Sequence, residues 1–175
     1  MLLLLRFMIK FHIIQSFNNM NNKKITCVDH YGKKYIFDAK QFINREAIYG
    51  IYISNKKVLL VQDSKSNKWE VPGGGKIELE TDYKCLKREY FEETNLTINK
   101  PIKFLTEFTS YFYDIDSQSP WKTTRKFYLV SKIKGKLQKG GNGIDIQKAE
   151  YISFRAFSTL SIDKGIKKIL TRYNP

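Results

Sequence analysis

Apolar and polar residues alternate over two early stretches of the chain, and each stretch predicts a pair of strands. Residues 25–37 change direction at Tyr31-Gly32-Lys33, and residues 48–62 do so at the polar run 54–57. A period of two is expected of a strand with one buried face, and turn-forming residues between two such runs indicate a hairpin. The second half of 48–62 is almost continuously apolar, which predicts a strand buried on both faces.

A short strand, a glycine run and a helix are predicted next. Residues 69–72 read WEVP, a strand that its proline ends, and glycines follow at 73–75. Thr81 is a residue type that caps helix N-termini, and from there the spacing of apolar residues is helical until Asn95. We therefore expect a helix over about 82–94.

The rest of the chain predicts a return to strands and one closing helix. Strands are expected at 102–113, 125–133 and 151–154, with a flexible loop at the glycine-rich stretch 140–143. Apolar residues at helical spacing over 158–172 predict an amphipathic helix. Strands on both sides of a central helix, followed by a terminal helix, indicate a mixed α/β domain.

The N-terminal segment differs from the rest because residues 1–17 are mostly apolar. They are too short for a membrane span, and basic residues interrupt them. An extension or start-site artefact, an extra packing helix and an interfacial membrane anchor all remain open. The expected organisation is an apolar extension at 1–19, an appended hairpin at 20–44 and one domain with a C-terminal helix over 45–175.

The composition of the chain narrows the chemistry that it can support. The chain has 175 residues, of which 42% are hydrophobic, enough for one domain with a sizeable core. Two cysteines, two histidines and no CxxC pair give little support to a zinc framework, a disulfide scaffold or a Ser-His-Asp triad. A reducing, cytoplasmic compartment is the expectation. With 31 Lys and Arg against 17 Asp and Glu, the net charge of +14 favours a polyanionic partner.

Acidic residues gather on one strip of the predicted helix. At 100° per residue, Glu92 and Glu93 lie on either side of Glu89, beside an apolar stripe and opposite the lysines. Carboxylates at this spacing repel one another, and a hard divalent cation such as Mg²⁺ or Mn²⁺ would remove the repulsion. Arg88 is one turn from Glu92 and can orient it. The alternative is a plain solvated face.

The spacing of residues around this helix is more specific than an acidic face. The pattern GX5EX7REXXEE, with every interval intact, is formed by Gly74, Glu80, Arg88, Glu89, Glu92 and Glu93. The segment resembles the Nudix box, GX5EX7REUXEEXGU, in which U is a bulky aliphatic residue. Two residues depart from it: Tyr90 replaces an aliphatic residue, and its hydroxyl needs a partner. Asn95 replaces a glycine, and Asn is the next-best residue in the left-handed conformation expected there.

The resemblance covers about residues 45–160 and implies a fold and an activity. The fold is an α/β/α sandwich with a mixed central sheet. The activity is divalent-metal-dependent hydrolysis of the diphosphate linkage in a nucleoside diphosphate joined to another group. Carried over to this chain, the ligands of Mg²⁺ or Mn²⁺ would be Gly74, Glu80, Glu89, Glu92 and Glu93. Arg88 would hold a glutamate in place, beside the catalytic Glu89 and Glu92.

The attacking water also needs a general base, and substrate needs contacts outside the glutamate strip. Asp145 and Glu150 are the candidate bases because both flank the strand after the glycine-rich loop, and Glu107 is a weaker third. Ordinary surface carboxylates are the alternative. The candidate substrate contacts follow the glycines or lie near the predicted loop 114–124, namely Gly75, Lys76, Tyr111, Tyr113, Trp121 and Arg125. Strand core is the alternative for the aromatic residues.

The uneven distribution of charge keeps more than one substrate class open. Residues 122–175 hold 13 basic and 3 acidic groups, and Lys132, Lys134 and Lys136 alternate along the exit of one strand. The first interpretation is a hydrolase of a nucleoside triphosphate, nucleotide sugar, ADP-ribose or dinucleoside polyphosphate. The second is an RNA 5′-end pyrophosphohydrolase or decapping enzyme, and the third is a non-catalytic nucleotide- or RNA-binding module. Phe91 points to the lysine side of the helix, toward the terminal helix or a second subunit, which leaves a homodimer open.

Overall fold

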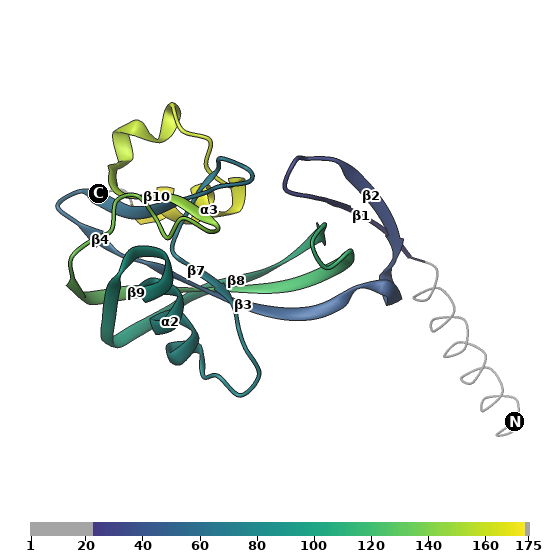
Figure 1. Ribbon diagram of the computed structural model, residues 1–175, viewed down its shortest axis with the longest axis horizontal. Helices are drawn as coiled ribbons and strands as arrows, with labels where there is room; N and C mark the ends of the chain where they lie inside the picture. The colour runs from purple at the N-terminus through teal and green to yellow at the C-terminus, as the bar shows by residue number, and fades with distance from the viewer. Residues whose placement is uncertain (1–22, 174–175) are drawn as a thin grey trace, which may run out of the picture. The chain divides into compact units, whose positions relative to one another are not determined.

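The described part of the chain forms two compact units. The computed structural model describes residues 23–173 (Figure 1), so the predicted extension at 1–19 lies outside the described residues. The smaller unit contains the described residues up to Asn44 together with 111–122, and the larger unit contains the remainder. The long strands β8 (Leu96–Asp114) and β9 (Ser119–Gly135) each contribute to both units.

The smaller unit is built on the hairpin that the alternation at 25–37 predicts. β1 (Lys24–Val28) pairs antiparallel with β2 (Lys34–Asp38), and Gly32 has a φ of 83° in the turn between them. A short 3-10 helix, η1 (Ala39–Gln41), follows β2. Val28 also pairs with Phe112 of β8. The hairpin is therefore confirmed, with the end of β8 as an additional strand.

One sheet of the larger unit contains the glycine run. Its strand order is β8-β9-β3-β7, in which β3 is Ile43–Ile51 and β7 is Gly73–Gly75. β7 pairs antiparallel with β3, so that Ile48 lies opposite Gly74. The glycines therefore extend the sheet as its last strand, and the position of the Gly74 backbone is set by pairing with β3.

A second sheet contains the strand that is predicted to be buried on both faces. The pairing partners of β5 (Lys57–Asp63) are β4 (Ile53–Ser54), β6 (Trp69–Glu70) and β10 (Ile146–Ser153). The prediction that residues 48–62 form one hairpin is wrong for its first strand. Residues 48–51 belong to β3, which pairs in the other sheet, and the strand that forms the hairpin with β5 is the short β4. The chain changes sheets between Ile51 and Ile53, which no local pattern indicates.

Helices cover both faces of the first sheet and produce an α/β/α sandwich (Figure 1). α2 (Asp82–Thr94) packs Tyr90 into a core that also contains Ile48. α3 (Lys164–Leu170) packs into a different core, and Tyr49 packs against this second core. Since Ile48 and Tyr49 are neighbours on β3 and side chains alternate along a strand, the two cores lie on opposite faces of that strand. The predicted fold class is confirmed.

Several elements differ in length from their predictions. β8 and β9 run into a tight turn at 115–118, where the sequence predicts a longer loop. β10 begins earlier than the strand predicted at 151–154, and residue 154 already belongs to the 3-10 helix η2 (Phe154–Ser158). The helix predicted at 158–172 is shorter because Asp163 caps its start by accepting a hydrogen bond from the Ile166 N–H, and η3 (Thr171–Tyr173) follows it.

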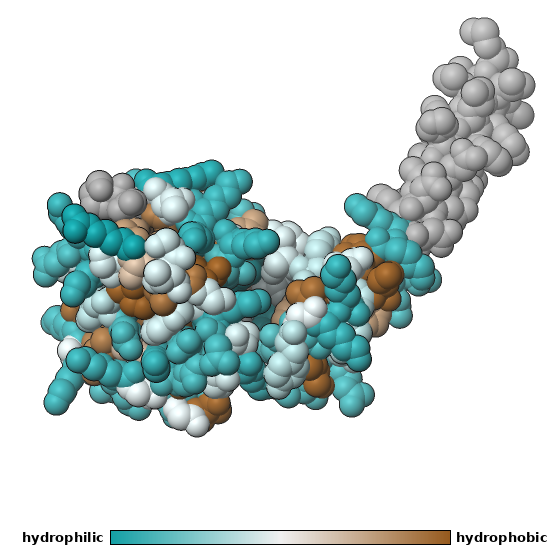
Figure 2. Space-filling model, turned by 90° about the horizontal axis from the view of Figure 1, so that it is seen from above, coloured by the Kyte–Doolittle hydropathy of each residue, from teal (hydrophilic) through white to brown (hydrophobic). Residues whose placement is uncertain are grey.

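The surface seen in Figure 2 is mostly hydrophilic, with hydrophobic residues in small separate patches. Phe91 is 57% exposed and belongs to neither core, so the contact with the terminal helix that its position suggests does not cover it. Within residues 23–173, no helix has the length and apolar composition needed to cross a membrane.

Candidate active site

Helix α2 begins and ends where its capping residues predict. The Thr81 hydroxyl accepts a hydrogen bond from the Lys84 N–H at 3.3 Å. Asn95 adopts the left-handed conformation, with φ 60° and ψ 21°, and its N–H donates to the Phe91 carbonyl. Both interactions are local in sequence and satisfy backbone groups at the helix ends. Glu89, Glu92 and Glu93 therefore lie on one continuous helix, as their spacing in the sequence predicts.

Arg88 binds three carboxylates and one carbonyl around α2. Its Nε and Nη2 form a bidentate pair with Glu80 at 2.9 and 3.0 Å. Nη1 donates to Glu89 Oε1 at 2.7 Å and to Glu92 Oε2 at 3.0 Å, and Nη2 also reaches the Gly75 carbonyl at 2.9 Å. The hydrogen bonds from Arg88 lower the pKa of Glu80 to about 2. The guanidinium thus fixes the carboxylates relative to the loop that precedes the helix.

Glu89 and Glu93 are buried carboxylates on the inner side of α2. Their exposed fractions are 9% and 7%. Burial raises the pKa of both carboxyl groups. Hydrogen bonding from Arg88 opposes this rise at Glu89. At Glu93 the rise is opposed by the Gly73 N–H, which donates a hydrogen bond to the carboxylate at 2.9 Å. After burial, the charges of Glu89 and Asp145 also raise the pKa of Glu93. Negative charge is concentrated here, where water screens it weakly.

The donor set on α2 suits a hard divalent cation. A single nitrogen, Arg88 Nη1, lies between Glu89 and Glu92, so oxygens of both side chains already approach one cationic atom. A Cβ at Gly74 would lie 2.7 Å from Glu89 Oε1, so a side chain there would fill the space against this carboxylate. Carboxylate and carbonyl oxygens are the ligands that Mg²⁺ and Mn²⁺ prefer. In the part of the chain that the structure describes, no three acidic, histidine or cysteine side chains are grouped as a finished metal centre.

A second ionic network holds the loop between β7 and α2. The Lys76 ammonium lies 3.0 Å from Glu46 and 2.9 Å from Asp82. Lys126 also contacts Glu46, and the Tyr128 hydroxyl donates to Asp82 at 2.6 Å. Hydrogen bonds from Lys126 and Lys76 lower the pKa of Glu46. The charge of Lys76, a predicted substrate contact, is therefore balanced by carboxylates of the protein itself.

The two candidate general bases have different surroundings. Asp145 precedes β10 and accepts a hydrogen bond from Asn142 Nδ2 at 2.6 Å. Burial is the main cause of the raised pKa of Glu89 and of Glu93, and the negative charge of Asp145 raises both pKa values further. Glu150 is an exposed residue within β10. The structure thus brings Asp145 within electrostatic range of the buried glutamates, while the role of either residue as a base stays a prediction.

The aromatic residues predicted to contact substrate belong to the smaller unit. Tyr113 stacks on Tyr35 with ring centroids 4.1 Å apart, and Tyr111 packs edge-on against Phe42 at 5.0 Å. Trp121, near the start of β9, donates from Nε1 to a serine hydroxyl in the preceding turn. The ring packing favours the strand-core interpretation for the two tyrosines, and a role in substrate binding stays a prediction.

Arg125 is largely buried in the larger unit. Its Nη2 pairs with Glu70 at 3.0 Å, and its guanidinium lies 4.5 Å from the centre of the Tyr49 ring. Burial raises the pKa of Glu70, and the charge of Arg125 opposes that rise. No pattern in the sequence indicates Glu46, Glu70 or Tyr49. Their partners lie on other strands, and no regular spacing in the sequence connects them.

Known proteins share this fold. The NUDIX domain family matches residues 44–173. The mutator MutT protein from Bacillus halodurans superposes with a TM-score of 0.60 at 23% identity, over 73% of this chain and 80% of that chain. The MutT NUDIX hydrolase from Burkholderia pseudomallei superposes with a TM-score of 0.61 at 15% identity, over 74% and 97% of the two chains. The NUDIX domain of Shewanella oneidensis NrtR, solved with ADP-ribose, superposes with a TM-score of 0.60 at 16% identity, over 78% and 91%. No curated protein matches the sequence. At these identities, the structural likeness shows the fold.

Proposed function

Because the chain belongs to the Nudix family of hydrolases, which act on pyrophosphate bonds, we propose that it hydrolyses a nucleoside diphosphate joined to another group, with Mg²⁺ or Mn²⁺ as cofactor. The proposed class includes nucleoside triphosphates, nucleotide sugars, ADP-ribose and dinucleoside polyphosphates. The observation that carries the proposal is the cluster in which one guanidinium, that of Arg88, binds Glu80, Glu89 and Glu92.

The cation would be held by oxygen atoms of α2 and of the glycine run that precedes it. The proposed ligands are the Gly74 carbonyl and the side chains of Glu89, Glu92 and Glu93. When bound, the ion would neutralise charge on the diphosphate and lower the pKa of a water molecule. Arg88 keeps Glu89 and Glu92 in place, and its bidentate pair with Glu80 fixes the orientation of the guanidinium itself.

We propose Asp145 as the base that takes a proton from the attacking water, in preference to Glu150. The support is electrostatic, since the charge of Asp145 acts on the pKa of Glu89 and Glu93, after the larger effect of burial. Asp145 is also exposed, so it is accessible to water. Gly143, two residues earlier, has a φ of 71°, a conformation that suits glycine and shapes this loop.

A substrate panel with identified products tests the proposal. The purified protein is offered each substrate class with Mg²⁺ or Mn²⁺, beside the variant Glu92→Gln. We expect the variant to lose at least about 100-fold in kcat, because a carboxylate charge of the ligand set is removed. Its thermal midpoint should hardly change, because the Glu92 side chain is 50% exposed.

The matched control for this experiment is Glu78→Gln, which removes the same charge from an exposed residue outside the cluster. This control should retain wild-type turnover. Full activity of Glu92→Gln would contradict the ligand assignment. Absence of turnover on every substrate with either metal would contradict the proposed function and favour a binding module.

A further inference from the structure

The hairpin formed by β1 and β2 has one packed face and one exposed face. Tyr35 and Phe37 stack on Tyr113, with ring centroids 4.1 and 5.5 Å apart, so alternate residues of β2 pack in an aromatic cluster. The residues between them lie on the opposite side of the hairpin, which we call the outer face. The pairing register and strand alternation assign to this outer face Lys24, Thr26, Val28, Lys34, Ile36 and Asp38.

Two exposed apolar side chains are neighbours on the outer face. Ile36 is 66% exposed, and Val28, also exposed, lies diagonally across the hairpin from it because Thr26 is the pairing partner of Ile36. Tyr31, in the turn between the strands, is 72% exposed. Single exposed apolar residues are common on protein surfaces, whereas adjacent ones favour a partner that removes them from water.

The charge around the hairpin is positive. Residues 1–44 contain seven Lys and Arg and two Asp, and no acidic residue precedes Asp29. Asp29 is buried in the turn, and Asp38 pairs with Lys24 at 3.1 Å. Lys34 is exposed on the outer face and has no salt bridge in the part of the chain that the structure describes. The protein's own carboxylates therefore leave positive charge here for an anionic partner.

The sequence that leads into β1 combines apolar and basic residues in the same way. Of residues 1–17, 12 are apolar, Arg6 and Lys10 are basic, and none is acidic. Such a segment is too short to span a bilayer, but its composition is typical of segments that bind at the boundary between lipid headgroups and acyl chains. Residues 18–22 alone separate it from Lys23, so the segment and the hairpin can contact one surface.

The apolar residues and the lysines together indicate the chemistry of the partner. A nucleic acid would bind the lysines through its phosphates but offers no apolar layer to Ile36. An anionic membrane offers both, because its lipid phosphates attract lysines and its acyl chains accept apolar side chains. A tyrosine such as Tyr31 also suits this boundary, since its ring is apolar and its hydroxyl is polar.

We propose that residues 1–17 and the outer face of the hairpin bind the surface of a membrane that contains anionic phospholipids. Apolar side chains of 1–17 enter the boundary between headgroups and acyl chains, Ile36 enters it from the hairpin, and Lys34 contacts lipid phosphates. Two contacts are needed because a single weak anchor binds membranes only marginally. The inference does not depend on the hydrolytic reaction, since the proposed metal ligands all belong to the larger unit.

Sedimentation of the full chain with lipid vesicles tests the proposal. One kind of vesicle contains phosphatidylcholine and phosphatidylglycerol, and the other contains phosphatidylcholine alone. We expect binding to the anionic vesicles to be at least about tenfold stronger and to weaken as salt is added. Lys34→Gln should weaken this binding about fivefold, because it removes one lysine from the anionic surface. Ile36→Gln should weaken it at least about threefold, and Phe7→Gln/Phe11→Gln at least about tenfold, because apolar side chains no longer leave water.

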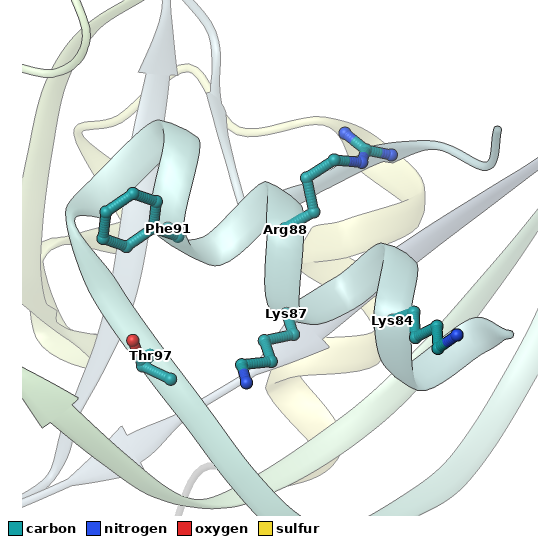
Figure 3. A pocket seen from close by; sticks show the side chains of 5 residues that line it. All are labelled: Lys84, Lys87, Arg88, Phe91 and Thr97. Atoms are coloured by element: carbon teal, nitrogen blue, oxygen red, sulfur yellow. The ribbon is translucent and has the colours of Figure 1, made fainter. Parts of the chain in front are cut away.

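The matched controls come from a groove of about 370 Å³ beside α2 in the larger unit (Figure 3). Lys87 and Phe91 line this groove, both are exposed, and the exposed fraction of Phe91, 57%, is similar to that of Ile36. Lys87→Gln therefore matches Lys34→Gln, and Phe91→Gln matches Ile36→Gln. Both controls should bind the anionic vesicles as the wild type does.

Three outcomes would overturn the proposal. The first is no binding to either kind of vesicle, and the second is an equal loss in the hairpin variants and in their controls. The third is a different partner on the outer face. A nucleic acid would be indicated if Lys34→Gln weakened binding to single-stranded RNA while Ile36→Gln left vesicle binding unchanged. A second copy of the chain would be indicated by a dimer in solution that Ile36→Gln converts to a monomer.

Hydrolysis of a soluble nucleotide separates this inference from the proposed function. Lys34→Gln and Ile36→Gln should retain the turnover of the wild type, because both side chains are exposed on the smaller unit. A protein that binds anionic vesicles as expected but hydrolyses nothing would contradict the proposed function alone. A protein that hydrolyses nucleotides but binds no vesicle would contradict only the membrane surface.

Discussion

Arg88 and its neighbour Lys87 are adjacent cations on α2, and their surroundings are opposite. Arg88 is 25% exposed, and every nitrogen of its guanidinium donates to a carboxylate of Glu80, Glu89 or Glu92. Lys87 is exposed and lies beside Phe91, with no carboxylate partner among the described residues. The same helix therefore carries one charge that fixes protein groups and another that is open to a ligand.

The difference has an energetic consequence. An exposed lysine contributes little to stability, because water and salt screen it. A partly buried arginine that holds several carboxylates is different, since removing it leaves those carboxylates without a counter-charge. Variants of the two residues should therefore differ in their free energy of unfolding. Variants of neighbouring residues should show how much activity and stability depend on the geometry of the Arg88 cluster.

The largest effect is expected for Arg88→Ala. We expect the free energy of unfolding to fall by about 2–3 kcal/mol, because the buried Glu89 loses its partner. The value of kcat should fall at least about tenfold, because Glu89 and Glu92 lose their orientation. Urea unfolding and steady-state kinetics would measure both. The matched control, Lys87→Ala, should change unfolding by no more than about 0.5 kcal/mol. Equal destabilisation by the two variants would contradict the contrast between them.

Gly74→Ala should have the next largest effect. The new Cβ would lie 2.7 Å from Glu89 Oε1 and would displace this carboxylate. We expect a loss of about 10- to 100-fold in kcat and about 1–3 kcal/mol in unfolding free energy. The control is Gly140→Ala, where a Cβ would meet nothing within 4 Å. If Gly74→Ala retained full kcat, the close approach of this backbone to Glu89 would not matter for the reaction.

The smallest effect is expected for Glu46→Gln, in the network at the start of α2. Hydrogen bonds from Lys126 and Lys76 lower the pKa of Glu46 in the folded protein. Ionised Glu46 therefore stabilises the fold above its unfolded pKa of about 4.3, and this contribution is lost as pH falls through the lower folded pKa. The stabilisation should stay below about 1 kcal/mol, because the side chain is 42% exposed.

Thermal midpoints of wild type and Glu46→Gln, measured from pH 7 down to pH 3, would test this. The wild type should be more stable at pH 7, and the difference should shrink toward zero as the pH falls below about 4. A difference that stays constant over this range would show that the ionised carboxylate is not what stabilises the loop.

The two departures from the Nudix box show what could be predicted and what could not. The left-handed conformation of Asn95 follows from its position after the helix, and the structure confirms it. The partner of the Tyr90 hydroxyl was not predictable: it donates to the Gly50 carbonyl at 2.8 Å. A Cβ at Gly50 would lie 2.6 Å from the Tyr90 ring, so the glycine makes room for the larger side chain. These residues are 40 positions apart, and no local spacing connects them.

Local patterns determined α2, its two caps and the order of its glutamates, because each depends on residues within a turn or two of one another. Tertiary structure decided which distant groups meet them. It brought Asp145 into electrostatic range of Glu93 and placed the Lys136 backbone against Asn95. It also moved the chain from one sheet to the other between β3 and β4. Such contacts depend on strand pairing and on the packing of the two cores. Hydrophobic periodicity specifies which face of an element is buried, but it does not specify the partner against which that face packs.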